Sequence, residues 1–311
     1  MLTTKRLEAH RRSGRIGLLR RLIESEQVTA YVLLTPTLIG LVVFTLGAVV
    51  AALLVSFTRW DLITPPQWVG LANYQAMLSL DGLARTALWN TVYYTIGTVP
   101  PGVILSLLLA IAMNQKVRGI ILYRTAYFLP VISSTVAIAL LWDWIYAPDY
   151  GLLNFLLRSL HLPTSQWLGD PSTAMPAVII MSVWRGLGFN MVIFLAGLQG
   201  IPQELYEAAR IDGANNWHTF RHITVPLLSP VIFFVTVLSI VGSFQVFDQT
   251  YVMTQGGPLN ATTTIVFYIY QQAFQWFHMG YAAALGYVLF AIILVFTLIQ
   301  FKLQTLWVHY E

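Results

Sequence analysis

The chain has 311 residues, of which 57% are hydrophobic and only 10% are charged, and its mean hydropathy is +0.68. Soluble domains carry roughly 25% charged residues because their surface must be solvated, so this composition excludes a soluble enzyme, a disordered chain and a collagen-like chain. Cysteine is absent, which excludes a disulfide framework, a thiolate nucleophile and a zinc site with cysteine ligands. The sequence therefore predicts an integral membrane protein.

Six apolar segments, each bounded by charged residues, are long enough to cross a bilayer. A spanning helix needs about 20 apolar residues. The first segment exceeds the roughly 7–15 apolar residues of a secretory signal, so it is predicted to be an uncleaved span. We expect one membrane domain over residues 30–305, after a basic tail at residues 1–29, with spans at about 31–57, 88–113, 126–146, 174–198, 224–247 and 281–303.

The uncharged stretch at residues 249–280 is not interpreted as a seventh span. It opens with Gly256-Gly257-Pro258 and a polar run, and aromatic residues then crowd together between Phe267 and Phe277. Aromatic side chains favour the headgroup level of a membrane. We interpret this stretch as a loop followed by an interfacial or partly inserted helix.

The placement of basic residues predicts the orientation of the spans. With the N-terminus inside, the cytoplasmic tail, loops and C-terminal end carry 13 of the 17 Lys and Arg residues, and the outer loops carry three. Basic residues gather in cytoplasmic loops, so we expect both termini to be cytoplasmic. Seven basic residues lie within the first 21 residues, a pattern that favours binding to anionic headgroups over binding to nucleic acid.

The predicted cytoplasmic loop at residues 201–224 contains more structure than a connector requires. Pro202 suits a first helical turn, and Ala208 and Ala209 leave a shallow surface on which another protein could pack. Gly213 permits the backbone to turn out of the helix. A second short helix, over about 216–224, is predicted to lead into the fifth span.

The spacing within this loop resembles that of a known family. Glu207-Ala208-Ala209, then Gly213, Ile223 and Val225-Pro226, resembles the EAA loop of ABC importer permeases, although that family usually has Leu where Val225 stands. The resemblance covers about residues 30–305 and is strongest to carbohydrate-type permeases, similar to the maltose, lactose and glycerol-phosphate systems. It is carried further by stretches such as Val69–Tyr74, Tyr127–Pro130, Ser182–Trp184, Phe244–Asp248 and Gln255–Pro258.

This resemblance implies an all-α integral membrane protein: six transmembrane helices of the type I importer fold, with a cytoplasmic coupling helix, in a bacterial or archaeal cytoplasmic membrane. It implies that Glu207 meets a basic group on an ATPase, that Ala208 and Ala209 allow close packing, and that Gly213 forms the turn. Asp212 is expected to belong to the same ATPase-coupling group. The implied partners are a second permease, two ATP-binding cassette subunits that bind ATP and Mg²⁺, and an external solute-binding protein. The alternative for the loop is an ordinary amphipathic surface helix.

The chain lacks the residues that would let it drive transport by itself. A P-loop needs Lys followed by Ser or Thr, and none of Lys5, Lys116 and Lys302 is so followed. An ion-driven carrier needs ionisable groups in mid-membrane, whereas Asp143 and Asp248 are predicted at the outer ends of spans. We therefore expect a non-enzymatic subunit, without a cofactor of its own, that imports a sugar, glycoside or polyol by alternating access.

Two other classes of protein remain as alternatives. A stand-alone carrier or channel would need no ATPase. A membrane enzyme such as a lipid-linked transferase would need a catalytic carboxylate or metal cluster, and neither is found. His218 and His222 lie four residues apart but lack a third ligand, so a solvated or partner-facing surface is favoured over a metal site.

The predicted solute path uses polar residues of spans four and five, because sugars are held by hydrogen-bonding and aromatic side chains. The alternative is that these residues bond or pack neighbouring helices. Arg185 is either a structural partner of Asp143 or Asp248, or a contact for solute, because a charge within a span is costly. The candidate path residues are Trp184, Arg185, Asn190, Ser243, Gln245, Asp248 and Gln249.

Overall fold

The computed structural model describes residues 26–79, 81–115 and 117–308. The basic tail predicted at residues 1–29 therefore lies outside the described residues up to residue 25, as does Lys116. The chain divides into two units after Val55.

The first unit is one long apolar helix with a widened turn in its middle. It consists of α2 (Glu26–Gly40), the π-helical turn η1 (Leu41–Leu46) and α3 (Gly47–Ser56). Thr29–Ser56 is long and apolar enough to cross a membrane. No residue between 29 and 55 is buried within the chain, so all sides of this helix suit contact with lipid or with another apolar surface.

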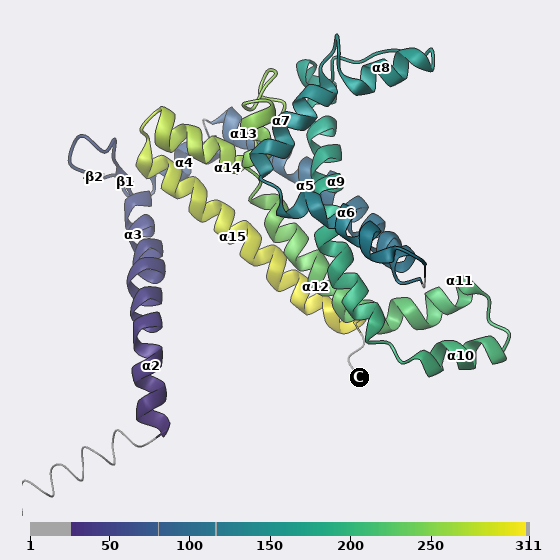
Figure 1. The fold of residues 1–311 in the computed structure, drawn as a ribbon. Coiled ribbons are helices and arrows are strands. Elements are labelled where there is room, and N and C mark those ends of the chain that lie inside the picture. The colour runs from purple at the N-terminus through teal and green to yellow at the C-terminus, as the bar shows by residue number, and fades with distance from the viewer. Residues whose placement is uncertain (1–25, 80, 116, 309–311) are drawn as a thin grey trace, which may run out of the picture. The chain divides into compact units, whose positions relative to one another are not determined.

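The second unit is a helical bundle (Figure 1). Its long helices are α5 (Gly82–Met113), α9 (Pro171–Gln199), α12 (Val225–Phe244) and α15 (Met279–Leu303). Across both units and within the described residues, five helices are long and apolar enough to span a membrane, or six when one bent pair is counted as a span. The prediction of an all-α membrane fold is confirmed.

The bent pair corrects the third predicted span. Residues 126–146 were expected to form one helix, but α6 (Ile120–Ile132) and α7 (Thr135–Tyr146) meet at an angle of 101°. The chain leaves the helical conformation at Ser133 and Ser134, whose ψ angles are 149° and 132°. Pro130 also lacks the N–H that the α6 ladder would use, so the last turn of α6 is weakened just before the break.

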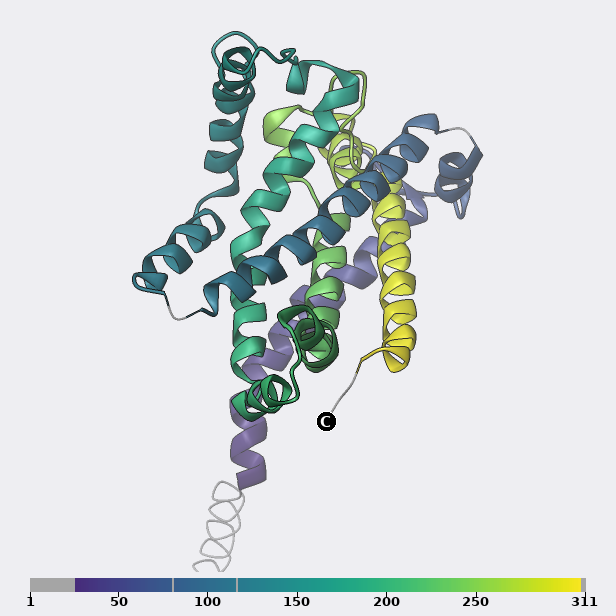
Figure 2. The same cartoon turned by 90° about the vertical axis from the view of Figure 1, so that its right-hand side faces the viewer.

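Short elements cover the two ends of this bundle (Figures 1 and 2). At one end, Thr58 and Arg59 of β1 pair antiparallel with Trp68 and Gln67 of β2. The same end carries α4 (Ala72–Ser79), α8 (Leu152–Ser159) and the 3-10 turn η2 (Trp167–Gly169). The opposite end carries α10 (Gln203–Ile211), α11 (Asn216–Thr219) and the 3-10 turn η5 (Gln304–Leu306).

The stretch at residues 249–280 folds into the bundle. It contains α13 (Asp248–Met253), α14 (Ile265–Tyr270) and the π-helical turn η4 (Gln271–Gln275). Thr262, Thr263 and Thr264 are fully buried. The final aromatic residues, Phe274, Trp276 and Phe277, are exposed, so this part of the stretch has the exposure that an interfacial position would require.

The core is divided among three clusters of buried side chains that pack the long helices together. Small residues set the closest approaches. A Cβ atom added to Gly97 of α5 would lie 2.6 Å from Cδ1 of Ile179 of α9, and one added to Gly188 of α9 would meet the carbonyl oxygen of Tyr127. The largest fully buried side chains include Tyr146, Met181, Phe194, Leu228, Phe267 and Leu285.

Candidate functional site

The predicted surface loop forms a helix with a well-defined end. After α10 the backbone N–H of Ala214 donates to the carbonyl of Ala209 at 2.9 Å, and that of Gly213 donates to the carbonyl of Arg210 at 3.1 Å. These two bonds form a Schellman motif, which needs a left-handed residue after the helix. Gly213 supplies it with a φ of 77°.

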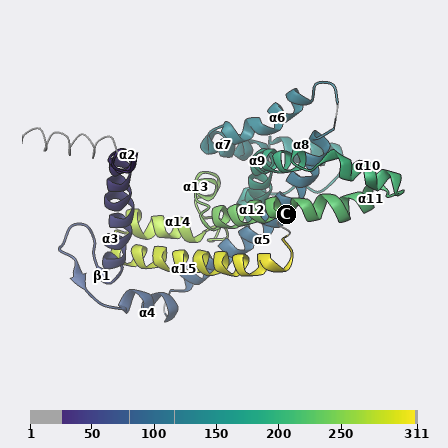
Figure 3. The ribbon, with the colours of Figure 1, turned by 90° about the horizontal axis from the view of Figure 1, so that it is seen from below.

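A second helix returns beside α10 and continues into the bundle (Figure 3). The side chain of Asn215 caps α11 by accepting from the N–H of His218 at 2.8 Å. The short helix predicted over about 216–224 does not end at Thr224. Instead α11, the π-helical turn η3 (Phe220–Thr224) and α12 form one helix of 29 residues, Asn216–Phe244. Pro226 does not break it and lies two residues after the π-helical turn, in which the N–H of Val225 donates to the carbonyl of Phe220.

The outer surface of α10 and α11 is exposed and partly apolar. Glu207 and Ala208 are exposed, while Ile211 is 87% exposed and Trp217 is 65% exposed. Large apolar side chains gathered at a polar helix pair are typical of a protein-binding surface. The surface also contains a hollow of about 430 Å³, lined by Ala209, Asp212, Gly213, Ala214, Asn215, His218, Thr219, His222 and Ile223.

His218 and His222 lie beside this hollow. Their rings stack with centroids 4.2 Å apart, and Nδ1 of His222 lies 3.0 Å from the carbonyl oxygen of His218. No group of three or more metal-ligating side chains occurs within the described part of the chain.

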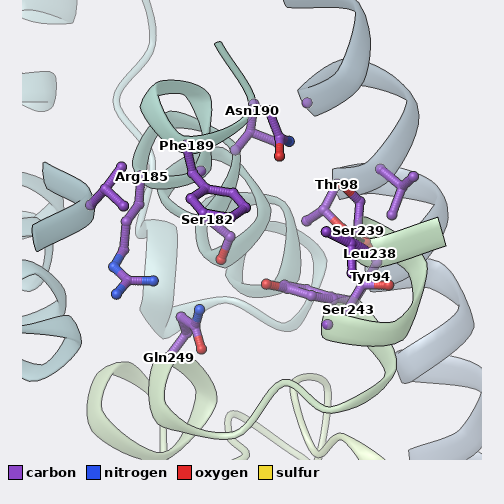
Figure 4. A pocket seen from close by; sticks show the side chains of 16 residues that line it. Tyr94, Thr98, Ser182, Arg185, Phe189, Asn190, Leu238, Ser239, Ser243 and Gln249 are labelled. Carbon is purple, nitrogen blue, oxygen red and sulfur yellow. Dashed lines mark hydrogen bonds between the residues drawn. The ribbon is translucent and has the colours of Figure 1, made fainter. Parts of the chain in front are cut away.

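A cavity of about 320 Å³ lies within the bundle, between α5, α6, α9, α12 and α13 (Figure 4). Polar side chains from four of these helices line it, together with apolar residues and glycines. Its polar lining consists of Tyr94, Thr98, Ser182, Arg185, Asn190, Ser239, Ser243 and Gln249.

The structure brings together four of the seven predicted path residues. Arg185, Asn190, Ser243 and Gln249 line the cavity. Gln245 and Asp248 line an adjoining hollow of about 190 Å³, which Tyr94 and Gln249 also border. Trp184 lines neither space, because its ring packs edge-on against Trp142 at 5.5 Å. The transport role of these residues stays a prediction.

Sequence reasoning missed the contribution of α5 to the cavity. Tyr94 and Thr98 are four residues apart and therefore share a helix face. Tyr94 is only 4% exposed, and the face it shares with Thr98 lines the cavity, as does Ser182 of α9. A polar residue at every fourth position of an apolar span was the available signal.

The polar side chains of the cavity differ in how fully they are bonded. Oγ of Ser243 lies 3.0 Å from Oγ1 of Thr95 and 2.8 Å from the carbonyl oxygen of Ile240, so it connects α12 to α5. The side chains of Asn190, Ser239 and Gln249, in contrast, form no hydrogen bond with another described residue. These three groups are available to a ligand.

Arg185 is the most unusual of these residues. It is the fifteenth of the 29 residues of α9, so it lies about 21 Å from either end of that helix at a rise of 1.5 Å per residue. Its Nε is buried without a hydrogen-bond partner in the part of the chain that the structure describes. Asp143 and Asp248 are both exposed, and within the same part neither forms an ion pair with Arg185.

Comparison with known proteins identifies the family. Residues 86–305 match the family of binding-protein-dependent transport system inner membrane components. The chain belongs to this family. As a family member it is a multi-pass membrane transport component, and the EAA-type loop described above is part of the matched region.

Several curated permeases are similar over nearly their whole length. The chain is 38% identical over 295 residues to the probable ABC transporter permease YesP of Bacillus subtilis, covering 94% of this chain and 95% of the relative. It is 38% identical to the arabinooligosaccharide transport permease AraP of the same organism, covering 92% and 91%. It is 34% identical to the trehalose/maltose transport permease MalF of Thermococcus litoralis, covering 89% and 94%.

Solved structures share the fold of this family member. One chain of a bacterial alginate ABC transporter, crystallised with an alginate-bound periplasmic protein, aligns with a TM-score of 0.80 at 24% identity, covering 89% of this chain and 93% of that chain. A chain from another crystal structure of an alginate importer aligns with a TM-score of 0.81, covering 92% and 98%. The fold is that of a type I importer permease, as predicted.

Proposed function

We propose that this permease translocates a sugar, glycoside or polyol across the cytoplasmic membrane by alternating access, driven by ATP hydrolysis in a separate subunit. The substrate class is supported by relatives whose names specify arabinooligosaccharides, lactose, and trehalose or maltose. It is also supported by the cavity, in which hydroxyl, amide and aromatic side chains stand among apolar ones. Such a lining suits a carbohydrate, whose hydroxyl groups need hydrogen-bonding partners within a largely apolar pocket.

The proposed complex contains a second permease, two ATP-binding cassette subunits that hold ATP and Mg²⁺, and an external solute-binding protein. The α10 end of the bundle would face the cytoplasm. Arg118, Arg124, Arg210, Arg221 and Lys302 lie in or beside the connections at that end, in agreement with the excess of basic residues in cytoplasmic loops.

The exposed helix pair carries this proposal. Glu207 and Ala208 lie on the open surface of α10, where Glu207 would meet a basic group of the ATPase and Ala208 and Ala209 would permit close contact. Gly213, with Asp212 before it, holds the turn.

A single helix connects this surface to the cavity wall. The unbroken helix Asn216–Phe244 begins in the surface loop and carries Ser239 and Ser243 on the cavity wall. Tyr206 of α10 also lies 3.2 Å from Thr224 of this helix, measured between the hydroxyl oxygens. We infer that closure of the ATPase dimer displaces α10 and α12 together.

The decisive experiment is ATP-driven uptake of a labelled oligosaccharide into proteoliposomes that hold the complete complex. Removing one charge-assisted contact across an interface costs about 1.5–3 kcal/mol, so Glu207→Ala is expected to lower solute-stimulated ATP hydrolysis and uptake roughly tenfold or more. Glu204→Ala is the matched control, because Glu204 is an exposed carboxylate of the same helix outside the motif.

A glycine pair tests the turn. Gly213→Ala places a Cβ at a positive φ, which costs about 1–2 kcal/mol, and is expected to reduce coupling. Gly70→Ala imposes similar strain at a φ of 60° on the opposite end of the bundle and should leave coupling intact. If the wild-type chain purifies alone and moves solute without ATP, the importer proposal fails and a stand-alone carrier replaces it.

A further inference from the structure

Arg185 places a positive charge at the midpoint of a membrane-spanning helix, and no described residue forms an ion pair with it. A charged side chain in the centre of a bilayer costs at least about 2.5–3.5 kcal/mol on insertion scales and is tolerated where it faces a cavity or a partner. Arg185 borders the cavity, and its buried Nε lacks a hydrogen-bond partner among the described residues. The guanidinium is therefore positioned to bind a group that the described part of the chain does not supply.

The rest of the cavity wall does not neutralise this charge. No carboxylate belongs to the lining. Asp248 borders the adjoining hollow and is exposed. The Arg185 side chain extends toward Gln249, and the hydroxyl of Tyr94 is directed toward the same region (Figure 4). An amide and a phenol can hydrogen-bond an anion beside a guanidinium, but neither carries a compensating charge.

We infer that the solute accommodated in this cavity carries an acid group, a carboxylate or a phosphate, which binds to Arg185. This inference rests on the proposed function and narrows its substrate class from carbohydrates in general to acidic carbohydrates. A guanidinium binds carboxylate and phosphate oxygens through two parallel N–H donors. A neutral sugar that displaced water from the cavity would leave the positive charge uncompensated.

The absence of cysteine from the chain allows a test that does not depend on knowing the solute. Ser239→Cys introduces one thiol into the cavity wall, and the complete complex is reconstituted in nanodiscs, where both faces are accessible. The thiol is reacted with methanethiosulfonates that carry either a sulfonate or a quaternary ammonium group, and the complex without the introduced thiol gives the background. A positive cavity raises the local concentration of anions tenfold or more, so the sulfonate is expected to react at least about tenfold faster relative to the ammonium than it does at an open site.

Two further variants complete the comparison. Thr164→Cys, in an exposed connection, provides the open site. Arg185→Gln in the Ser239→Cys background is expected to abolish the preference for the anion, whereas Arg185→Lys should keep most of it. If the Ser239→Cys site shows no anion preference, or if Arg185→Gln leaves that preference unchanged, a counter-charge from the second permease or from elsewhere already neutralises Arg185 and the inference is wrong.

The nature of the acid group is distinguished by protection. Glucuronate, glucose 6-phosphate and glucose are compared at equal concentration for their ability to slow reaction of the Ser239→Cys thiol with a neutral thiol reagent. Protection by glucuronate indicates a carboxylate, protection by glucose 6-phosphate indicates a phosphate, and protection by glucose to the same extent as either contradicts the inference. None of these readings requires transport, so the inference can fail while ATP-driven uptake is intact, and the reverse.

Discussion

Gly188 illustrates how closely two helices approach when one residue lacks a side chain. A Cβ at this position would meet the carbonyl oxygen of Tyr127 and the backbone of Phe128, whereas a Cβ at Gly186, half a turn away, would meet nothing within 4 Å. Overpacking costs about 1–3 kcal/mol. We therefore expect Gly188→Ala to lower the thermal unfolding midpoint of the detergent-solubilised complex and Gly186→Ala to leave it nearly unchanged. Equal midpoints for the two variants would show that α6 moves away without cost.

Asp81 joins three elements at the end of the bundle that carries the β-hairpin. Its Oδ2 accepts hydrogen bonds from the hydroxyl of Tyr268, at 2.6 Å, and from that of Tyr281, while Oδ1 accepts from the N–H of Ala84. Burial raises the pKa of this carboxyl, but the hydrogen bonds from Tyr268 and Tyr281 and the backbone together lower the pKa by more. The pKa of Asp81 therefore lies below its ordinary value. The charged form is therefore more stable in the folded protein than in the unfolded chain.

This depressed pKa predicts how stability depends on pH. The Asp81 carboxylate contributes its full stabilisation of the fold above the unfolded pKa of about 4, and this stabilisation is lost as the pH falls through the lower folded pKa. The difference in unfolding midpoint between wild type and Asp81→Asn should therefore be constant from pH 7 to about pH 5 and shrink below pH 4. A difference that stays constant down to pH 3 would show that the charge of Asp81 contributes nothing.

At the scale of elements, α5 fixes the chain that follows α13. The side-chain amide of Asn90 donates to the carbonyl oxygens of Asn260 and Thr263 at 2.8 and 3.0 Å, and Oγ1 of Thr91 accepts from the N–H of Ile265 at 2.9 Å. This loop contains no regular secondary structure, so side chains of α5 satisfy backbone groups that a helix would satisfy internally.

Loss of the hydrogen bonds between Asn90 and this loop has a measurable consequence. Asn90→Ala removes the side-chain donor from the buried carbonyl of Thr263, at about 1–3 kcal/mol, while the carbonyl of Asn260 still accepts from the N–H of Thr263 at 3.2 Å. The variant should increase hydrogen exchange at residues 259–265 and lower the unfolding midpoint. Asn114→Ala, an exposed position at the other end of the same helix, is the control and should change neither. Unchanged exchange in Asn90→Ala would mean that packing alone holds the loop.

The elements themselves show where sequence reasoning succeeded and where it could not. Runs of apolar residues between charges predicted the long helices, because the membrane requires a minimum length of apolar helix. The break at Ser133 was not predicted, since serine within an apolar run is compatible with a helix. Only packing against neighbouring helices decides whether the helix continues at this position. The unbroken passage from Asn216 to Phe244 was also missed, because Pro226 was interpreted as a boundary between two helices.

At the scale of the molecule, the family and fold were predictable and the cavity was only partly so. The spacing from Glu207 to Pro226 is local in sequence and identified the loop directly. The cavity instead combines Tyr94 of α5 with Gln249 of α13, residues that only the packing of the bundle brings together. Arg185 was recognised because a charge within a span is conspicuous, but the absence of an ion pair with Asp143 or Asp248 could be seen only in three dimensions.

The π-helical turn η3 determines the rotational phase between the surface loop and the cavity wall. A π turn accommodates one more residue than an α turn, so removing one residue from Phe220–Thr224 should convert it to an α turn while α10 and Ser239 keep nearly the same relative orientation. Removing Ile232 from the regular part of α12 would instead rotate everything beyond it by about 100°, at 3.6 residues per turn. We expect ATP-driven uptake to survive the first deletion and to be lost in the second. This result would show that transport depends on the rotational orientation of this helix as well as on its length.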